Sequence, residues 1–449
     1  MKLVFTLISL SLYLFQVFPV AAARQQPNTK SFAQWCQQKN SVPAVIQHTI
    51  DLLLREAGTQ ECQLADSKLQ NLTSLSFESQ RIEDIQPLAN FSNLTHLELR
   101  KNQIRDLQPL TRLTNLTYLG LNENKIRDLH PLTGLNKLQY LEINNNQIRD
   151  LQPLSGLSKL YTIALESNQI VDLKPLSGLS KLFSLKLNRN QIINLQPLAK
   201  SINLSNLELE NNLVVNLKPL SGLTNLLNLQ LESNQIVDLK PLAGLSKLFS
   251  LKLSNNQIVD VKPLNSLSNL WFLRLGKNPI SNVEPLAKLT NLTHLYLFKN
   301  EINEVKPLAS LNNLEFLVLD DNRIDDVQSL AGLNKLTALH LSGNQIDNIK
   351  PLAGLINLRE LGLNTDRIHA LQPLAGLINL TLLRLGENKI VDVKPLSGLT
   401  KLELLYLNNN QIIDFKSLNS LKKLILLDLT NNPIITKVCP VEPVSNCQF

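Results

Sequence analysis

Apolar and polar positions along this chain follow a unit of 22 residues that recurs about 17 times. The unit that begins at Leu94 reads L-T-H-L-E-L-R-K-N-Q-I-R-D-L-Q-P-L-T-R-L-T-N. In L-x-L the two leucines face the same way, as in a short strand. The apolar spacing that follows is close to three, and a recurring proline would interrupt any long helix. Each unit therefore predicts one coil, made of a short strand, a corner and an extended or 3₁₀-like return.

An asparagine marks the corner of nearly every unit. It stands at Asn102, Asn124, Asn146, Asn168, Asn190, Asn212, Asn234, Asn256, Asn278, Asn300, Asn322, Asn344, Asn388, Asn410 and Asn432. Gln80 holds this place in a weaker first copy, and Asp366 holds it in a late copy, where we expect a loosened coil. A buried amide can pair with turn backbone that a strand leaves unsatisfied. Because no insertion breaks the period, we predict one elongated solenoid whose stacked coils share a core.

The segments N-x-I-x-x-L-x-P-L and L-x-x-L-x-L, repeated every 22 residues, resemble leucine-rich repeats of the internalin-like bacterial type. The resemblance covers residues 72–433. It implies an α/β-type solenoid, a horseshoe with a parallel β-sheet on the concave face and 3₁₀ or extended turns on the convex face. In this family the concave face commonly holds a protein ligand. The resemblance therefore implies a non-catalytic scaffold that binds a protein.

Residues 1–23 have the pattern of a signal peptide. Lys2 is the positive end, an apolar run follows, and three alanines offer a cleavage site before Arg24. An uncleaved anchor is the alternative, because the apolar run is nearly long enough to span a bilayer. We expect a disordered leader over 24–30 and an exported mature protein, secreted, periplasmic or at the cell surface, without stable membrane insertion.

All four cysteines lie outside the repeats, in an N-terminal cap (31–71) and a C-terminal cap (434–449). With strands about 4.8 Å apart, the coils separate the two caps by roughly 80 Å, far beyond the reach of a disulfide. The predicted disulfides are Cys36–Cys62 and Cys439–Cys447, which fit an oxidising compartment. A metal site is the alternative, but no histidine stands near either pair at ligand spacing. We predict no metal and no cofactor.

The N-terminal cap contains one clear helical pattern. Ser41 is the candidate N-cap, Pro43 lies in the first turn, and Gly58 is a plausible end after about four turns. The apolar side of this helix would cover the first coil, which otherwise exposes its core to water. We expect Trp35 to pack within the same N-terminal cap.

Side chains two, four and six residues before each asparagine should point onto the inner face of the sheet. Most coils place small or polar residues there, but three adjacent coils differ. The candidate partner-binding patch comprises Phe272, Arg274, His294, Tyr296, Phe298, Phe316, Val318 and Asp320. Adjacent exposed aromatics mark interfaces, and Tyr, Phe and Arg are typical anchors. The alternative interpretation is cross-strand packing that stiffens the sheet.

Three smaller groups share columns of the predicted sheet. Tyr118 and Tyr140 lie in one column near the N-terminal end and are candidate partner contacts. A cluster near the C-terminal end comprises Leu382, Arg384, Leu404 and Tyr406. A flank column comprises Tyr161, Phe183, Leu227, Phe249 and Trp271, for which packing against the neighbouring coil is the stronger interpretation. Residues 165–187 recur at 231–253 with only Ser177 changed to Ala243, which indicates a duplicated block of three coils.

Several function classes are disfavoured. The formal charge of +7 is spread over a lysine column with an aspartate column beside it, so no coherent basic face for nucleic acid is predicted. The six histidines are scattered, and no motif for a nucleophile or a phosphate loop is present, so we predict no catalytic residues and no enzyme. The aspartate column is better explained by turn chemistry. Besides protein binding, binding of carbohydrate or another envelope component and a passive spacer role stay open.

Overall fold

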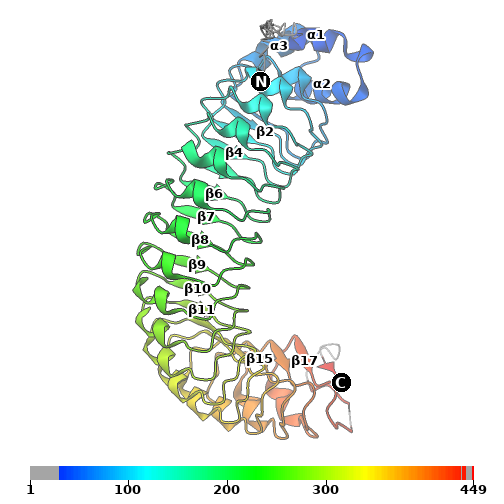
Figure 1. The fold of residues 1–449 in the computed structure, drawn as a ribbon. Coiled ribbons are helices and arrows are strands. Elements are labelled where there is room, and N and C mark those ends of the chain that lie inside the picture. Colours follow the sequence, from blue (N-terminus) through cyan, green and yellow to red (C-terminus); the bar gives the residue numbers. More distant parts are fainter. Residues whose placement is uncertain (1–29, 436, 441–446) are drawn as a thin grey trace, which may run out of the picture.

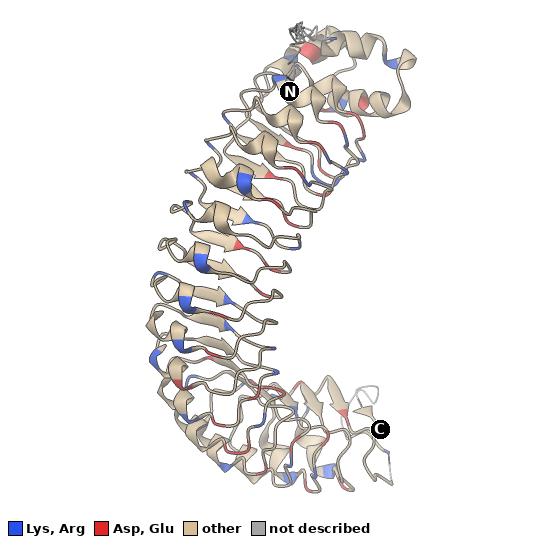
Figure 2. Cartoon of the chain, in the orientation of Figure 1, with Lys and Arg blue, Asp and Glu red and all other residues tan. Residues whose placement is uncertain are grey.

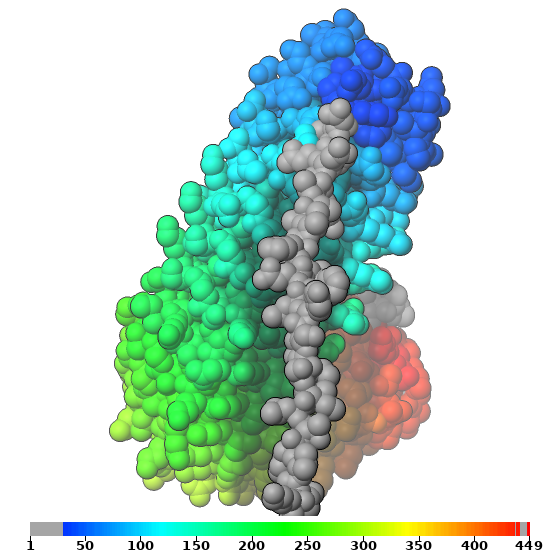
Figure 3. Space-filling model, turned by 45° about the horizontal axis from the view of Figure 1, so that its top comes forward, coloured from blue at the N-terminus to red at the C-terminus, as the bar shows by residue number. Residues whose placement is uncertain are grey.

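The structure of the protein, a computed structural model, describes residues 30–435, 437–440 and 447–449. The predicted signal peptide and, apart from Lys30, the predicted leader lie outside these residues. The described chain forms one curved stack of coils that runs from a helical cap to the C-terminal end (Figure 1). The space-filling view shows the stack continuing without a break from the blue cap into the green coils (Figure 3). The predicted single solenoid is confirmed.

Each coil contributes one strand of three residues to a single parallel sheet. The strands are β1 (Ser74–Ser76), β2 (His96–Glu98), β3 (Tyr118–Gly120), β4 (Tyr140–Glu142), β5 (Thr162–Ala164), β6 (Ser184–Lys186), β7 (Asn206–Glu208), β8 (Asn228–Gln230), β9 (Ser250–Lys252), β10 (Phe272–Arg274), β11 (His294–Tyr296), β12 (Phe316–Val318), β13 (Ala338–His340), β14 (Glu360–Gly362), β15 (Leu382–Arg384), β16 (Leu404–Tyr406) and β17 (Leu426–Asp428). Neighbours in the chain pair in a register of one repeat, as Leu75 with Leu97. Every middle residue faces the core, so the register stacks the same apolar column throughout.

The return of each coil is a short 3₁₀ helix on the outer side of the bend (Figure 1). These helices are η2 (Gln86–Leu88), η3 (Gln108–Arg112), η4 (His130–Leu132), η5 (Gln152–Leu154), η6 (Lys174–Gly178), η7 (Gln196–Leu198), η8 (Lys218–Leu220), η9 (Lys240–Leu242), η10 (Lys262–Ser266), η11 (Glu284–Lys288), η12 (Lys306–Ser310), η13 (Gln328–Gly332), η14 (Lys350–Gly354), η15 (Gln372–Leu374), η16 (Lys394–Gly398) and η17 (Lys416–Ser420). The recurring proline occupies the first turn, where its missing N–H costs no hydrogen bond. The predicted 3₁₀ returns are confirmed.

The asparagine of each coil ties its own corner to the coil before it. Asn212 accepts a hydrogen bond from the backbone N–H of Ile192 at 3.0 Å, and its amide donates to the carbonyl oxygens of Leu187 (3.0 Å) and Leu209 (3.1 Å). The aspartate column also has a backbone role, because Asp172 accepts the N–H of Lys174 at 2.8 Å. The turn interpretation of these aspartates is confirmed.

Three α-helices close the N-terminal end: α1 (Phe32–Gln37), α2 (Ala44–Ala57) and α3 (Cys62–Gln70), with a 3₁₀ turn, η1 (Lys39–Ser41), after α1. The sequence prediction covered only α2. Gly58 ends that helix, as predicted, and the structure shows it in the left-handed conformation. The prediction of Ser41 as its N-cap was wrong: Pro43 holds the N-cap position, and the Ser41 hydroxyl donates instead to the carbonyl oxygen of Gln38.

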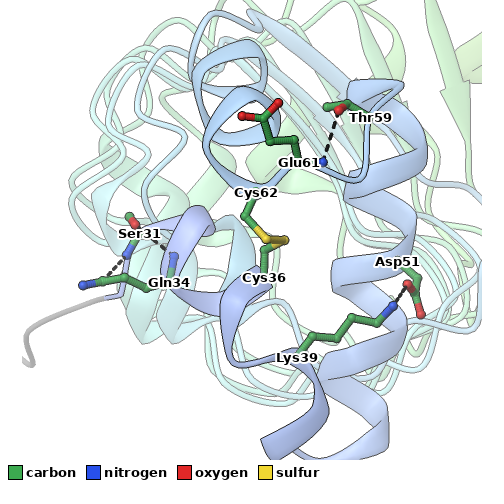
Figure 4. Close-up of a disulfide and its surroundings, with 8 residues drawn as sticks. All are labelled: Ser31, Gln34, Cys36, Lys39, Asp51, Thr59, Glu61 and Cys62. Carbon is green, nitrogen blue, oxygen red and sulfur yellow. Dashed lines mark hydrogen bonds and ion pairs between the residues drawn. A yellow bond between two sulfur atoms is a disulfide. The ribbon is translucent and has the colours of Figure 1, made fainter.

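The first helix of the cap begins with a capping box that the sequence analysis missed. The backbone N–H of Gln34 donates to the Ser31 hydroxyl, and the Gln34 side chain accepts from the Ser31 N–H (Figure 4). Trp35 is partly buried against the core, as expected for a residue of the N-terminal cap. The Lys30 ammonium lies 4.6 Å from the centroid of the Trp35 ring.

Two disulfides account for all four cysteines. Cys36 of α1 is bonded to Cys62 of α3 (Figure 4), with their Cα atoms 5.5 Å apart. Cys439 and Cys447 form the second bond. The C-terminal end also adds β18 (Cys447–Gln448), which pairs with β17, while Phe449 packs against Phe415. The end of the sheet is therefore covered by the chain itself.

Charged residues of both signs are interleaved along the coils (Figure 2). In residues 30–435, 437–440 and 447–449, no helix has both the length and the apolar character needed to cross a membrane.

Candidate functional site

The candidate patch lies on three adjacent strands, β10, β11 and β12. Phe272, His294 and Phe316 are partners in the sheet register, and Arg274, Tyr296 and Val318 form the next column. All these side chains are partly exposed, whereas the leucines between them are fully buried. The structure thus brings the predicted residues together on one surface.

Ring stacking organises the first column of the patch. The rings of His294 and Phe316 lie 4.6 Å apart and nearly parallel, and the ring of Phe272 lies 5.7 Å from His294. Tyr296 approaches Phe272 at 5.6 Å. Burial lowers the pKa of His294, while Glu315 raises it and Arg274 lowers it. The imidazole is therefore neutral at pH 7 and stacks as an uncharged ring.

Arg274 lies between two aromatic rings. Its guanidinium carbon is 4.8 Å from the ring centroid of Tyr296 and 5.2 Å from that of Phe272. One guanidinium nitrogen also reaches 3.9 Å from a carboxylate oxygen of Glu232, two coils earlier. Burial raises the pKa of Glu232, and Arg274 lowers it in part. These contacts hold the only cation of the predicted patch in a fixed orientation.

Phe298 lies at the corner that follows β11. Its ring lies against Gly276 so closely that a Cβ atom there would collide with it. Tyr296 and Phe298 are both partly exposed, not sealed in the core. The absence of a side chain at Gly276 therefore leaves the space that the Phe298 ring occupies.

Asp320 has a structural role that the sequence analysis missed. Its carboxylate accepts the backbone N–H of Ser342 at 2.8 Å, as Asn144 does for Glu166 in an earlier coil. Burial raises the pKa of Asp320, while His340 lowers it. The His294 ring hydrogen-bonds the Thr293 hydroxyl at 2.8 Å.

Two further residues border the patch. Trp271 of the flank column meets the rings of Phe272 (5.8 Å) and His294 (5.7 Å) edge to face. His340 continues the column of Arg274 and lies 3.5 Å from a carboxylate oxygen of Glu360. The column position of His340 could have identified it, whereas the ring contacts of Trp271 cross two columns and could not be read from the period.

Tyr118 and Tyr140 are register partners, but their rings contact different neighbours. Tyr118 stacks on His96 at 4.1 Å, and its hydroxyl donates to Glu98 at 2.9 Å. Burial is the main cause that raises the pKa of the Tyr118 hydroxyl, and the hydrogen bond to Glu98 raises it further. Tyr140 is more exposed and meets Tyr161 edge to face. This pair therefore forms no joint surface like that of the central patch.

The C-terminal cluster is sparser. Arg384 lies 5.7 Å from the ring centroid of Tyr406, with Leu382 and Leu404 as partners in the adjacent column. In the flank column, Tyr161 stacks on Phe183 at 4.9 Å, which matches the packing interpretation for those two rings. Within the part of the chain that the structure describes, no group of three His, Cys, Asp or Glu side chains could hold a metal ion.

Comparison with known proteins agrees with this geometry. A family model for leucine rich repeats, in two copies, matches residues 70–112, 92–136, 114–158, 136–178, 290–332 and 378–419. The sequences of curated proteins gave no match. Leucine-rich repeats form extended curved surfaces that generally serve as binding scaffolds.

Solved structures with the same fold include two bacterial proteins. An internalin from Listeria monocytogenes is 29% identical with a TM-score of 0.53, and the match covers 81% of this chain and 97% of that one. A leucine-rich-repeat protein of Leptospira interrogans is 28% identical with a TM-score of 0.69, covering 83% of this chain and 93% of that one.

A plant receptor shares the fold at lower identity. The ectodomain of a membrane receptor kinase from Arabidopsis thaliana, in complex with CASPARIAN STRIP INTEGRITY FACTOR 2, is 24% identical with a TM-score of 0.66. That match covers 82% of this chain and 52% of the receptor chain, and it shows the fold alone. Because the repeat model matches these segments and the two bacterial structures cover 81% and 83% of it, this chain is an internalin-like leucine-rich-repeat protein.

Proposed function

We propose that the protein is an exported, non-catalytic scaffold that binds another protein through the concave patch on β10, β11 and β12. The observation that supports this proposal is the set of partly exposed rings of Phe272, His294, Tyr296 and Phe316, held side by side on a rigid sheet. Apolar surface of this kind is costly to leave in water and is typical of interfaces. The two disulfides fit the oxidising compartment that export implies.

Preorganisation is the proposed mechanism of binding. The strand backbone is fixed by hydrogen bonds to both neighbouring coils, so association orders little of this chain. The rings supply apolar contact area, and Arg274, held over Phe272 and Tyr296, supplies one oriented positive charge. A partner that offers an apolar projection beside a carboxylate would match both features.

Replacement of two rings tests the assignment. The mature chain and a Tyr296→Ser/Phe316→Ser variant are used to capture proteins from extracellular material, and each captured protein is then purified and titrated directly. We expect the variant to lose affinity about tenfold or more, because hot-spot rings contribute on the order of 2 kcal/mol each. Thermal unfolding should change little, since both side chains are partly exposed.

A matched control is Val171→Ser, which removes an apolar side chain that is 52% exposed outside the patch. This control should capture and bind as the original chain does. Equal binding by the patch variant would refute the site. Retention on isolated envelope glycan, lost in the same variant, would indicate the carbohydrate alternative, and no specific retention of any kind would indicate a spacer.

A further inference from the structure

A second hollow surface lies on the flank of the sheet, along strands β6 to β9, which are green in Figure 1. We name it the flank trough and define it by Phe183, Ser205, Leu227 and Phe249, one residue from each of four successive coils. It consists of two adjoining hollows of about 520 and 510 Å³ that share Ser205 and Leu227. Ser205 is buried, while Phe183 and Phe249 are 38% and 36% exposed. The flank side chains Ser205 and Leu227 are smaller than the rings of Phe183 and Phe249 in the coils on either side. This difference in size leaves the hollow between the two rings.

The two ends of the trough carry the same short segment. Phe183 and Phe249 occupy equivalent positions in the duplicated block, and each follows a lysine by two residues, Lys181 and Lys247. The block offset is three coils, so the two rings are separated by about 14 Å at the usual spacing of strands. The flank trough thus presents one recognition element twice, at a fixed distance.

The charge of the trough has one sign. The lining of the two hollows includes Lys181, Lys247 and Lys252, and none of the lining residues is aspartate or glutamate. Lys247 is oriented by a hydrogen bond to the Asn225 side-chain oxygen at 2.7 Å, and the Asn225 amide is itself anchored on the carbonyl oxygen of Ile202 at 2.9 Å. The lining is therefore positively charged, and Lys247 is held in place by an anchored neighbour.

The comparable hollow farther along the same flank has a different character. It is lined by Lys335, Arg359 and Lys401, but it also contains Glu315 and has no aromatic ring. The combination of rings, an aliphatic floor and exclusively positive charge is found in the trough between Phe183 and Phe249. Its complement is an acidic ligand with bulky apolar groups.

We propose that the flank trough binds an extended acidic peptide segment with two bulky apolar side chains four residues apart. An extended chain advances about 3.3 Å per residue, so four residues span about 13 Å, close to the separation of the two rings. Residues i and i+4 of such a chain also point to the same side. Each apolar side chain then packs against one phenylalanine, and neighbouring carboxylates pair with Lys181 and Lys247. This inference goes beyond the proposed function, because it concerns a surface beside the concave patch, which it meets only at Phe272.

The test uses three labelled peptides and fluorescence anisotropy. The first probe has nine residues, with phenylalanine at the third and seventh positions and aspartate or threonine elsewhere. The second replaces each aspartate by lysine, and the third moves the second phenylalanine to the sixth position. We expect saturable binding of the first probe, about tenfold or more weaker binding of the other two, and a loss of affinity as salt rises.

Substitutions locate the binding. Phe183→Ser/Phe249→Ser should weaken the first probe about tenfold or more, whereas Ile425→Ser, at a 61% exposed position of the same flank column, should leave its affinity within about twofold. The concave variant Tyr296→Ser/Phe316→Ser should also bind this probe normally, which separates this inference from the proposed function. Circular dichroism should show that all three variants are folded.

Three outcomes would overturn the inference. They are no saturable binding of the first probe, equal binding of the lysine probe, and unchanged binding in the Phe183→Ser/Phe249→Ser chain. If a sulfated oligosaccharide binds the trough while the acidic peptide does not, positive charge alone is recognised and the peptide assignment is wrong.

Discussion

The carboxylate of Asp366 accepts the backbone N–H of Ile346 at 3.1 Å, at a corner position where all the other coils after the first use an asparagine. Its second oxygen is buried and has no hydrogen-bond partner among the described residues. An asparagine in this position donates to carbonyl oxygens, as Asn388 does to Leu363 at 2.7 Å, but an ionised carboxylate has no proton to donate. Burial raises the pKa of Asp366 to about 7, against the lowering effect of the backbone N–H groups of Ile346 and Asn344.

Stability around Asp366 should therefore fall as pH rises. Between the ordinary pKa of 3.8 and the folded-state value of about 7, the folded chain holds a proton that the unfolded chain releases. This contribution to the free energy of unfolding is present below about pH 4 and is lost as pH rises to 7. Asp366→Asn should remove the dependence and raise the free energy of unfolding at pH 8 by up to about 4 kcal/mol. Chemical denaturation of both chains from pH 4 to pH 8 measures the difference, and parallel pH curves would contradict it.

Loss of one corner asparagine should cost far more than loss of a surface one. Asn300 accepts from the N–H of Ile280 (3.2 Å) and donates to the carbonyl oxygens of Leu275 (3.1 Å) and Leu297 (2.9 Å). Asn300→Ala leaves these buried groups unpaired, so we expect a loss of about 3 kcal/mol or more. Asn136→Ala, at an exposed position, should stay within about 0.5 kcal/mol. Urea denaturation compares the two, and equal midpoints would show that the corner bonds contribute little.

Opening the N-terminal disulfide should destabilise the cap before the central coils. The two cysteines are 26 residues apart, so their bond restricts the unfolded chain. Cys36→Ser/Cys62→Ser should therefore lower the free energy of unfolding of the cap by about 3 kcal/mol. Because each coil contacts only its neighbours, the effect should fade with distance along the stack. Hydrogen exchange followed by mass spectrometry should show faster exchange in α1 and α3 and unchanged exchange in β10, β11 and β12. Uniform acceleration along the chain would mean that the whole solenoid unfolds as one unit.

Gly276→Ala should displace a ring of the concave patch without unfolding the coil. The added Cβ would collide with the ring of Phe298, which is partly exposed and can rotate away. We expect a stability loss of about 1 kcal/mol and a changed ring environment for Phe298. Nuclear magnetic resonance of labelled phenylalanine measures the second effect. Gly178→Ala, where a Cβ meets open space, is the control and should leave that signal unchanged.

The repeating core could be read from the sequence with few errors. Period-two leucines, a proline in the first turn of a 3₁₀ helix and an asparagine at the corner each act over a few residues, and their spacing is covalent. The disulfide pairs also followed, because the length of the stack excludes any bond between its ends. The N-cap of α2 did not follow, because Ser41 ends the preceding η1 turn and its hydroxyl donates to the carbonyl oxygen of Gln38.

Placement of the patch residues in columns came from the sequence as well, but their roles within it did not. The sequence suggested that Asp320 contacts a partner, yet its carboxylate accepts a hydrogen bond from the backbone N–H of Ser342 in the next coil. Tyr118 and Tyr140 share a column, yet their rings contact other neighbours, Tyr118 by stacking on His96 and Tyr140 edge to face with Tyr161. A column fixes which face a side chain emerges on, whereas its rotamer depends on the side chains above and below it.

The sequence by itself determined the solenoid, its register and its core, because every coil repeats the same short-range spacing and stacking follows from the shared apolar column. Only the tertiary structure decided which rings meet across coils, that Trp271 joins the flank to the concave patch, and that Ser205 and Leu227 leave a hollow between Phe183 and Phe249. These features arise between residues at least one repeat apart, where side-chain size and orientation in neighbouring coils set the surface.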